Sequence, residues 1–408
     1  MDGSGAVKAG LLAAIGTHRQ EFEAAGIRAE AERNLPSGTM ATLRELGAFW
    51  LKTPAELGGT PLDPLDFCDV LEEFAYTDGA TAWAVMVGNG GTGTAGGWLP
   101  HAGARRVFVP GRPLPLVMGT PGPRGTGRPA AGGYVVSGQW SFASGCGHAD
   151  WLIGGFRSAG PDGRLMVAIV PREHATVIDN WRVAGLRGSG SFDFRLEEVF
   201  VPADLTFERA ASACRGGALF NVEAHVFLSN ELPPLMTGMA RRALDEMSGL
   251  AGQAARVPGG PSLADRPAFH AELGRAQTRL RAARAAHREA VMATWDAARA
   301  GAVPPRMHTD LTVASVFAAE TCADLSQTLF RYGGGRLLAL SELMQRLLRD
   351  LLAARQHIGL SEEAYERAGR DRLAAGLPDA PAAIRLCTGV PPNQIRYVSG
   401  VPRYKSVM

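Results

Sequence analysis

The feature that most constrains the fold is a change in hydrophobic periodicity, which occurs twice along the chain. From about residue 6 to 109, apolar residues recur every three to four positions, as Leu71, Phe74 and Ala75 do, which is typical of helices with one buried face. After about residue 114, short segments rich in Val, Ile, Phe and Tyr alternate with Gly, Pro or Asp, which favours strands. From about residue 218 the segments are again long, Ala-rich and periodic, which indicates a helical bundle.

These patterns predict an α+β fold in four parts. We expect an N-terminal helical domain over residues 1–113, a β-domain over 114–214, a helical bundle over 215–390 and a tail over 391–408. The predicted strands are Leu116–Gly119, Gly133–Ser137, Trp151–Phe156, Arg164–Val170 and Phe192–Phe200. The predicted long helices are Leu235–Gln253, Ser262–Ala300, Thr309–Phe330 and Leu338–Arg355.

Composition argues against several functional classes. The 408 residues carry a net charge of +2, so we expect neither a nucleic-acid partner nor a polybasic membrane face. No apolar run reaches the roughly 18 residues that a membrane-spanning helix needs. The five cysteines lie far apart without metal-ligand or redox spacing, so no metal site is expected. Their odd number, with no signal-peptide pattern at the N-terminus, favours a cytoplasmic protein.

Several segments, taken in order, resemble the acyl-CoA dehydrogenase superfamily across nearly the whole chain. The similar segments are Pro54–Gly59, Leu71–Glu73, Asp78–Trp83, Gly133–Trp140, Gly185–Ser191, Val199–Pro202 and Gln345–Ser361. The resemblance implies an N-terminal helical domain, a middle β-barrel domain that contacts a flavin, and a C-terminal four-helix bundle. It also implies a homotetramer, or at least a dimer, with flavin sites at the subunit contacts.

The segment Trp140–Trp151 resembles one branch of the superfamily more closely, the reduced-flavin monooxygenases. Members of that branch take reduced flavin from a separate flavin reductase and use O2, through a C4a-hydroperoxide, to oxygenate a small organic molecule. The resemblance therefore implies reduced FAD or FMN and O2 as cofactors, a reductase as partner and a small-molecule substrate. The chain has no nicotinamide-binding βαβ pattern, which agrees with a separate reductase.

Within this segment, the resemblance places Trp140, Phe142, Ala143 and Ser144 against the flavin ring. The ring needs flat apolar contact on one side and hydrogen bonds at its polar edge near N5. Trp140 or Phe142 would give the contact, and Ser144 or the Ala143 backbone the hydrogen bonds. Taken without the resemblance, Trp140 and Phe142 are ordinary aromatic residues of a β-domain core.

A glycine turn follows one of the long helices. Arg331, Gly333, Gly334 and Gly335 resemble the turn at which these enzymes receive the nucleotide part of the flavin from a neighbouring subunit. Glycines let backbone amides approach a phosphate closely. The alternative interpretation is that the three glycines only terminate the helix.

The loop after Arg349-Asp350 lacks the residue that a dehydrogenase needs. An acyl-CoA dehydrogenase requires a carboxylate to remove an α-proton, and the resemblance puts Ile358 at that position. Glu231 lies one turn from the alternative base position of the superfamily and stays a candidate base. His357 resembles the pocket histidine of the monooxygenases, which would assist the oxygen reaction near neutral pH. His357 and Ser144 are therefore the predicted catalytic residues.

Four residues are candidates for the substrate pocket: Asn89, His148, Arg256 and Ile358. The phenol hydroxylases of this branch often carry a second histidine in the helix after Thr81–Trp83, where this chain has Asn89–Gly93, so a phenolic substrate is in doubt. The small residues there are expected to leave open volume. A surface or structural role is equally compatible with Asn89, His148 and Arg256.

Three functions remain open. The leading one is a flavin-dependent monooxygenase. The second is a flavin-dependent acyl-thioester dehydrogenase with Glu231 as its base. The third is a non-catalytic member of the superfamily that serves as a binding partner. Flavin retention separates the third from the others, and the reaction of the reduced flavin with oxygen separates the first from the second.

Overall fold

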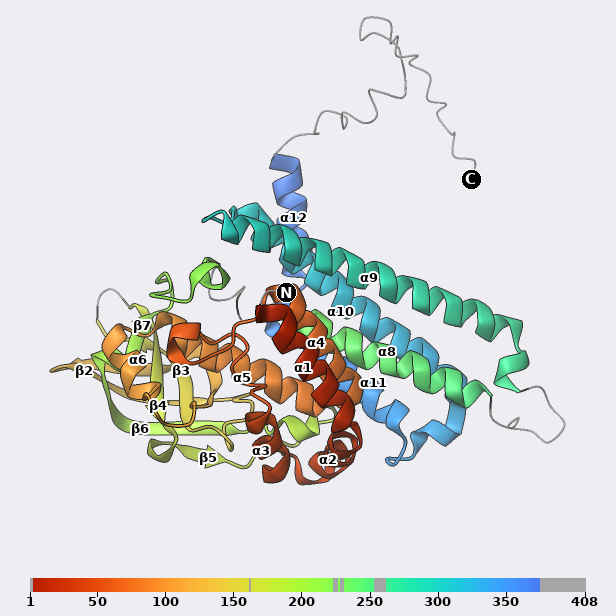
Figure 1. Cartoon of the computed structure of the whole chain (residues 1–408), viewed down its shortest axis with the longest axis horizontal. Helices are drawn as coiled ribbons and strands as arrows, with labels where there is room; N and C mark the ends of the chain where they lie inside the picture. The colour runs from red at the N-terminus through yellow and green to blue at the C-terminus, as the bar shows by residue number, and fades with distance from the viewer. Residues whose placement is uncertain (1–2, 161–162, 223–226, 228–230, 253–261, 375–408) are drawn as a thin grey trace, which may run out of the picture. The chain divides into compact units, whose positions relative to one another are not determined.

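The computed structural model describes residues 3–160, 163–222, 227, 231–252 and 262–374 (Figure 1). The chain divides into two compact units, Met1–Ala364 and Tyr365–Met408, and the site described below lies within the first. Arg256 and the predicted tail at 391–408 lie outside the described residues. The domain boundaries near residues 113, 214 and 390 stay predictions.

Helices fill the first part of the chain, as the periodicity predicts. Leu71, Phe74 and Ala75, the predicted apolar stripe, are fully buried. Asp78 caps the longest of these helices, because its carboxylate accepts a hydrogen bond from the Thr81 amide at 2.8 Å. The helices are α1 (Gly3–Thr17), α2 (Arg19–Glu32), α3 (Ser37–Glu45), α4 (Pro64–Thr77), α5 (Gly79–Trp98) and α6 (His101–Val107), with a 3-10 turn η1 (Ala55–Leu57).

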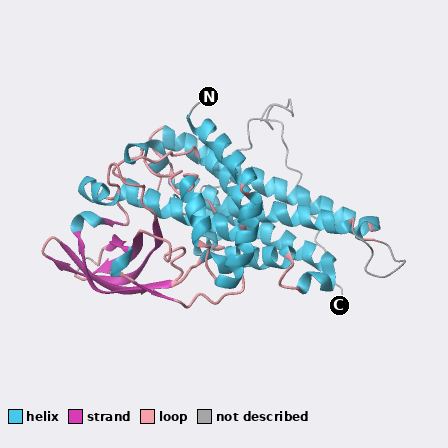
Figure 2. Ribbon diagram, turned by 60° about the horizontal axis from the view of Figure 1, so that its bottom comes forward, coloured by secondary structure: helices cyan, strands magenta, loops and turns pink. Residues whose placement is uncertain are grey.

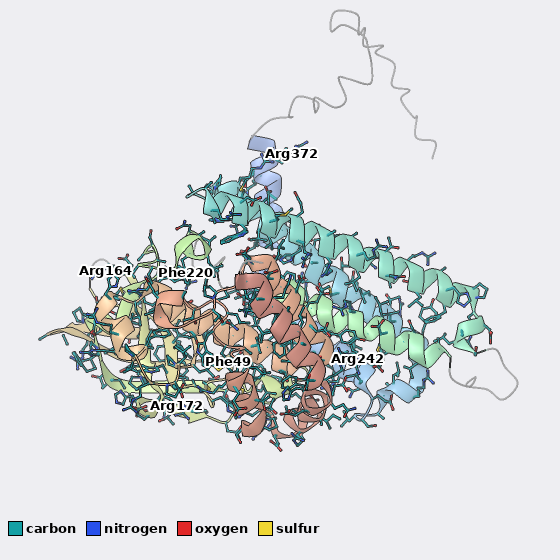
Figure 3. All side chains as sticks on the ribbon, viewed as in Figure 1. Phe49, Arg164, Arg172, Phe220, Arg242 and Arg372 are labelled. Carbon is teal, nitrogen blue, oxygen red and sulfur yellow. The ribbon has the colours of Figure 1, made fainter. Side chains whose placement is uncertain are left out.

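Helix α5 is buried along nearly its whole length, and its glycines bring neighbouring segments close. A Cβ at Gly88 would lie 2.5 Å from the Phe49 ring, which is labelled in Figure 3, and a Cβ at Gly91 would overlap the Val117 carbonyl oxygen. The expectation that the small residues of this helix leave open volume is wrong, because adjacent side chains and backbone fill the space.

The middle of the chain forms one seven-stranded sheet in the order β5-β6-β2-β1-β3-β4-β7. Its neighbours are antiparallel except β1 and β3, which are parallel, and Figure 2 shows the strands gathered beside the helices. This sheet confirms the expected β-domain, with β5 and β7 at its two ends. The strands are β1 (Val117–Ala130), β2 (Gly133–Trp140), β3 (Trp151–Ser158), β4 (Leu165–Pro171), β5 (Thr176–Ile178), β6 (Asp193–Pro202) and β7 (Thr206–Glu208).

The C-terminal part is the predicted bundle. Helices α8, α9, α10 and α11 pack against one another, and α8 also packs against α4, so one continuous hydrophobic core joins the bundle to the N-terminal helices and the sheet. The helices are α8 (Leu232–Ala251), α9 (Pro267–Arg299), α10 (Pro305–Gly333), α11 (Leu343–Arg355) and α12 (Glu363–Ala374). Among the described helices, none is both long and apolar enough to cross a membrane. Nor do the described residues bring three or more His, Cys, Asp or Glu side chains together as metal ligands.

Candidate functional site

The two predicted catalytic residues meet at a third residue, Trp83 of α5. The indole Nε1 of Trp83 donates a hydrogen bond to Ser144 Oγ at 3.0 Å. The ring of His357, which lies after the end of α11, meets the Trp83 ring edge-on, with 6.1 Å between centroids and 66° between planes. Three distant segments of the chain therefore converge on one indole ring.

Ser144 also begins a chain of buried hydroxyl groups. Its Oγ lies 2.7 Å from Ser191 Oγ, and Ser191 Oγ lies 2.7 Å from Ser189 Oγ. An indole N–H only donates, so Ser144 Oγ must accept the bond from Trp83. The proton of Ser144 is then directed to Ser191 or to a bound molecule, and the two other hydroxyls can rotate to match either choice.

The loop that carries these serines is tied to the bundle by Asp350 of α11. The Leu186 amide, just before the 3-10 turn η3 (Arg187–Ser189), donates to Asp350 Oδ1 at 2.5 Å. Asp350 is buried, and desolvation raises its pKa to about 7, although the Leu186 N–H and Arg346 act in the opposite direction. Arg346 also lies 3.7 Å from the Asp78 carboxylate that caps α5. Asp350 therefore links α11 to the serine loop.

His357 is held in one tautomer. Its Nδ1 accepts a hydrogen bond from the Gly359 amide at 3.1 Å, so the neutral ring carries its proton on Nε2. Burial lowers the pKa of His357 below its usual value, so the ring is neutral near pH 7. The ring thus offers one N–H donor. Ile358 follows in the turn η8 (Ile358–Leu360), and its side chain is 89% exposed on the isolated chain.

The flat apolar surface predicted near Ser144 comes from Phe142 and not from Trp140. Trp140 is fully buried and stacks on Phe194, with 4.8 Å between centroids and 9° between planes, so it is a core aromatic residue. Phe142 is 65% exposed and takes a positive φ of 60°. Its ring meets Trp181 edge-on at 5.9 Å. The exposed Phe142 ring and the partly buried Trp181 ring together form an aromatic surface beside the serine chain.

The backbone of Ala143 is already bonded within the protein. Its N–H donates to the Phe192 carbonyl at 3.0 Å, and its carbonyl accepts from the Cys146 amide at 3.1 Å. The side-chain hydroxyl of Ser144 is therefore the better candidate for a hydrogen bond to a ligand than the Ala143 backbone.

The glycine turn lies at the end of α10. Gly333 is the last residue of that helix, and Gly334 takes a positive φ of 63° at the start of η7 (Gly334–Leu338). Arg331 is exposed and donates to Thr328 Oγ1 at 3.4 Å. The turn packs against α10 and α11. Its geometry agrees with the helix-terminating interpretation, and its flavin role stays a prediction.

Two of the candidate pocket residues, Asn89 and His148, differ in how their polar atoms are bonded. The Asn89 amide is fully buried and hydrogen-bonds three backbone groups. It accepts from the Leu51 amide and donates to the carbonyls of Ala48 and Val85. These bonds attach α5 to the loop before η1, which is a structural role. Burial lowers the pKa of His148, whose Nε2 has no hydrogen-bond partner among the described residues.

Glu231 is paired with Lys52. Lys52 Nζ donates to Glu231 Oε1 and to the Phe227 carbonyl, and both side chains are buried. Burial raises the pKa of Glu231 and lowers that of Lys52, while the pairing acts in the opposite direction on each. A Cβ at Gly93 of α5 would lie 2.8 Å from the Lys52 carbonyl oxygen, so Lys52 packs about 15 Å along the helix from Trp83. Glu231 is therefore not placed beside Ser144 and His357.

Sequence reasoning missed Trp83, Ser189, Ser191 and Trp181 as site residues. The one local signal for Trp83 is a large indole between small Ala residues, and Trp98 at the other end of the same helix carries a similar signal. The serine loop has no such signal, because its contact with Ser144 is made only when β2 and β6 pair.

The chain is similar to proteins of one family. Two family models match, "Acyl-CoA dehydrogenase, N-terminal domain" over residues 17–96 and "Acyl-CoA dehydrogenase, C-terminal domain" over residues 233–362, together more than half of the chain. The indole-3-acetate monooxygenase of Pseudomonas putida is 27% identical over 343 residues, which are 83% of this chain and 87% of that protein.

One further relative and one solved structure are also similar to this chain. The flavin-dependent monooxygenase oxygenase subunit HsaA of Rhodococcus jostii is 34% identical over 178 residues, 42% of this chain and 44% of that protein. The structure of XiaF from Streptomyces sp. in complex with FADH2 and glycerol superposes with a TM-score of 0.85 at 23% identity, over 91% of this chain and 96% of that one. At that identity the superposition establishes the shared fold.

Proposed function

Because the chain belongs to the acyl-CoA dehydrogenase superfamily, we propose that it acts as a flavin-dependent monooxygenase, which uses reduced FAD or FMN and O2 to oxygenate a small organic molecule. The observation that carries the proposal is the convergence of Ser144 and His357 on Trp83. Among the described residues, no carboxylate hydrogen-bonds Ser144 or the His357 ring. Relatives that are monooxygenases by name support it, and HsaA is a flavin-dependent monooxygenase by name.

The residues around Trp83 suit a reduced flavin. Phe142 presents an exposed ring for a flat ligand, with Trp181 packed beside it, and Ser144 has a hydroxyl proton to direct at a polar edge. His357 adds an N–H donor from the bundle side. When bound, the flavin supplies the electrons and the reaction with O2. The contribution of the protein is to hold these donors in place and to keep water from the reacting atoms.

A dehydrogenase reaction has less support. It needs a carboxylate near the flavin ring that can take up an α-proton. Ile358 has no proton acceptor, and Glu231 is paired with Lys52 near the other end of α5. The monooxygenase proposal requires no such base.

The proposal extends to partners and assembly. HsaA is by name the oxygenase subunit of its system, and we propose that this chain likewise receives reduced flavin from a separate reductase. We also propose a homotetramer. Purified protein with bound flavin should not oxidise NADH at an appreciable rate until a flavin reductase is added, and efficient turnover without one would contradict this part.

The decisive experiment separates the oxygen reaction from dehydrogenation. The protein is loaded with flavin, reduced without oxygen, and mixed rapidly with 18O2 in the presence of an indole, an aromatic sulfide and a phenol. We expect 18O in one of these products. In a parallel anaerobic sample, an acyl thioester should not bleach the oxidised flavin. If the acyl thioester does bleach the flavin, and Glu231→Gln abolishes that bleaching, the protein is a dehydrogenase. If the protein retains no flavin, a non-catalytic role is left.

A further inference from the structure

A second polar group lies in an apolar cavity away from Trp83. The cavity measures about 40 Å³ and lies between α4, the start of α8, α9 and α10. Its walls include Phe67, Phe227, Trp295 and Leu311. One water needs roughly 10–15 Å³ by the same measure, so the cavity has room for a few atoms more than one water.

The Lys52–Glu231 pair forms the polar side of this cavity. Lys52 Nζ bonds Glu231 Oε1 and the Phe227 carbonyl and lies 3.7 Å from the centroid of the Phe227 ring. Glu231 is 2% exposed, and its second oxygen, Oε2, accepts no hydrogen bond from the described residues. A buried acceptor without a partner is rare in folded proteins and calls for a donor at that place.

Charge limits what that donor can be. Lys52 and Glu231 together carry no net charge, whichever of them holds the shared proton. A carboxylate placed against Oε2 would meet like charge, and an ammonium group would lie close to Lys52 Nζ. A neutral hydroxyl or N–H group satisfies Oε2 without leaving a buried charge uncompensated.

We propose that this cavity is a binding site for the hydroxyl- or N–H-bearing end of a neutral, largely apolar organic molecule. The donor of that molecule bonds Glu231 Oε2, and its carbon atoms contact Phe67, Phe227 and Trp295. The site is separate from the Trp83 cluster. Lys52 packs against Gly93 of α5, which lies about 15 Å along that helix from Trp83.

The test uses four probes of similar size that differ in their polar group: 1-butanol, diethyl ether, butyrate and butylammonium. Binding to the full-length protein at pH 7, before any flavin is added, is measured by ligand-observed NMR. We expect 1-butanol to bind about tenfold more tightly than each of the others, since ether lacks the donor hydrogen and the remaining two are charged. Because no flavin or oxygen is present, the result is independent of the proposed monooxygenase activity.

Two variants test whether 1-butanol binds in this cavity. The double variant Lys52→Met/Glu231→Leu removes both charges together, which a buried pair tolerates better than loss of one, and should abolish the preference for butanol over ether. The variant Val291→Phe fills the cavity, keeps the pair, and should weaken butanol binding about tenfold. As a control, Arg242→Met/Glu23→Leu removes another ion pair, eleven residues along α8 from Glu231, and should change nothing.

Equal binding of the four probes would overturn the proposal, as would butanol binding that survives both cavity variants. The absence of any binding up to the solubility limit would also overturn it, and would mean that the cavity holds water only.

Discussion

At the scale of single residues, Trp83 connects the two halves of the candidate site. It donates one hydrogen bond to Ser144 and packs its ring edge against His357. Because an indole N–H cannot accept, the Ser144 proton cannot point at Trp83 and is left to Ser191 or to a bound molecule. Trp83 is thus a positioning residue, whereas Ser144 and His357 are the proposed contacts to the flavin.

The first prediction concerns His357. His357→Ala should keep flavin binding but lower the rate of product formation by about 10²–10³, the usual loss when one aligned donor is removed, and release more hydrogen peroxide. Stopped-flow absorbance with a product assay measures both. If the rate of product formation and the release of hydrogen peroxide are both unchanged, His357 has no role in the reaction. Burial lowers the pKa of His357 below its ordinary value of 6.5. When the wild-type protein is acidified, the activity that depends on neutral His357 should therefore be lost only below pH 6.5.

The second prediction concerns the indole N–H of Trp83. Trp83→Phe should lower the free energy of unfolding by about 1 kcal/mol and also release more peroxide per product, because Ser144 Oγ loses the donor that restricts where its proton can point. Trp98→Phe is the matched control, since it removes an indole N–H that donates to the Ala211 carbonyl at 2.9 Å. The control should lose similar stability with normal coupling. If both variants release the same amount of peroxide per product, Trp83 does not position the Ser144 proton.

At the scale of elements, the link between α11 and the serine loop depends on one carboxyl group. Asp350 receives the Leu186 amide, and the same loop continues to Ser189 and Ser191. Burial raises the pKa of Asp350 to about 7, against an ordinary value near 3.8, so the folded protein prefers the protonated form. The stability that this preference gives is complete below about pH 4 and is lost as the pH rises to about 7.

The third prediction follows from that sign. Urea unfolding of the wild type should show stability falling with pH between about 4 and 7, by roughly 1 kcal/mol per unit from this group. Asp350→Asn, which can still accept from the Leu186 amide, should remove that part of the slope. A variant with the same slope as the wild type would show that Asp350 does not titrate in this range.

The elements were largely predictable from sequence and the site only in part. Period and composition identify the helices and strands because those signals are local, and the superfamily resemblance adds their order. Trp140 and Phe142 show where local signals end. Both share one face of an ideal strand, but β2 stops at Trp140 and the positive φ of Phe142 turns its side chain outward. The hydroxyl chain and the Lys52–Glu231 pair arise only from tertiary contacts.

At the scale of the whole molecule, α9 is the longest described helix, and much of its surface is not covered by its own chain. It runs for 33 residues, of which only eight are buried. A helix of that length on a single subunit needs a partner for its remaining surface or must present it to water.

The fourth prediction is therefore an assembly larger than one chain. Light scattering of the flavin-loaded protein at micromolar concentration should give a homotetramer, or at least a dimer. A mass of one chain under those conditions would contradict the proposed assembly.

The glycines of α5 also have a consequence for how the molecule folds. Seven glycines in a 20-residue helix each disfavour helix formation by about 1 kcal/mol relative to alanine, so α5 is unstable as an isolated segment. We therefore expect it to become helical only when β1, Phe49 and the bundle close around it, so that Trp83 is ordered at the same late stage. Amide hydrogen exchange in α5 should then occur only through global unfolding, and local opening at lower free energy would show that the helix forms early. The binding geometry at Trp83 is in that case a late product of folding, which no partly folded chain can display.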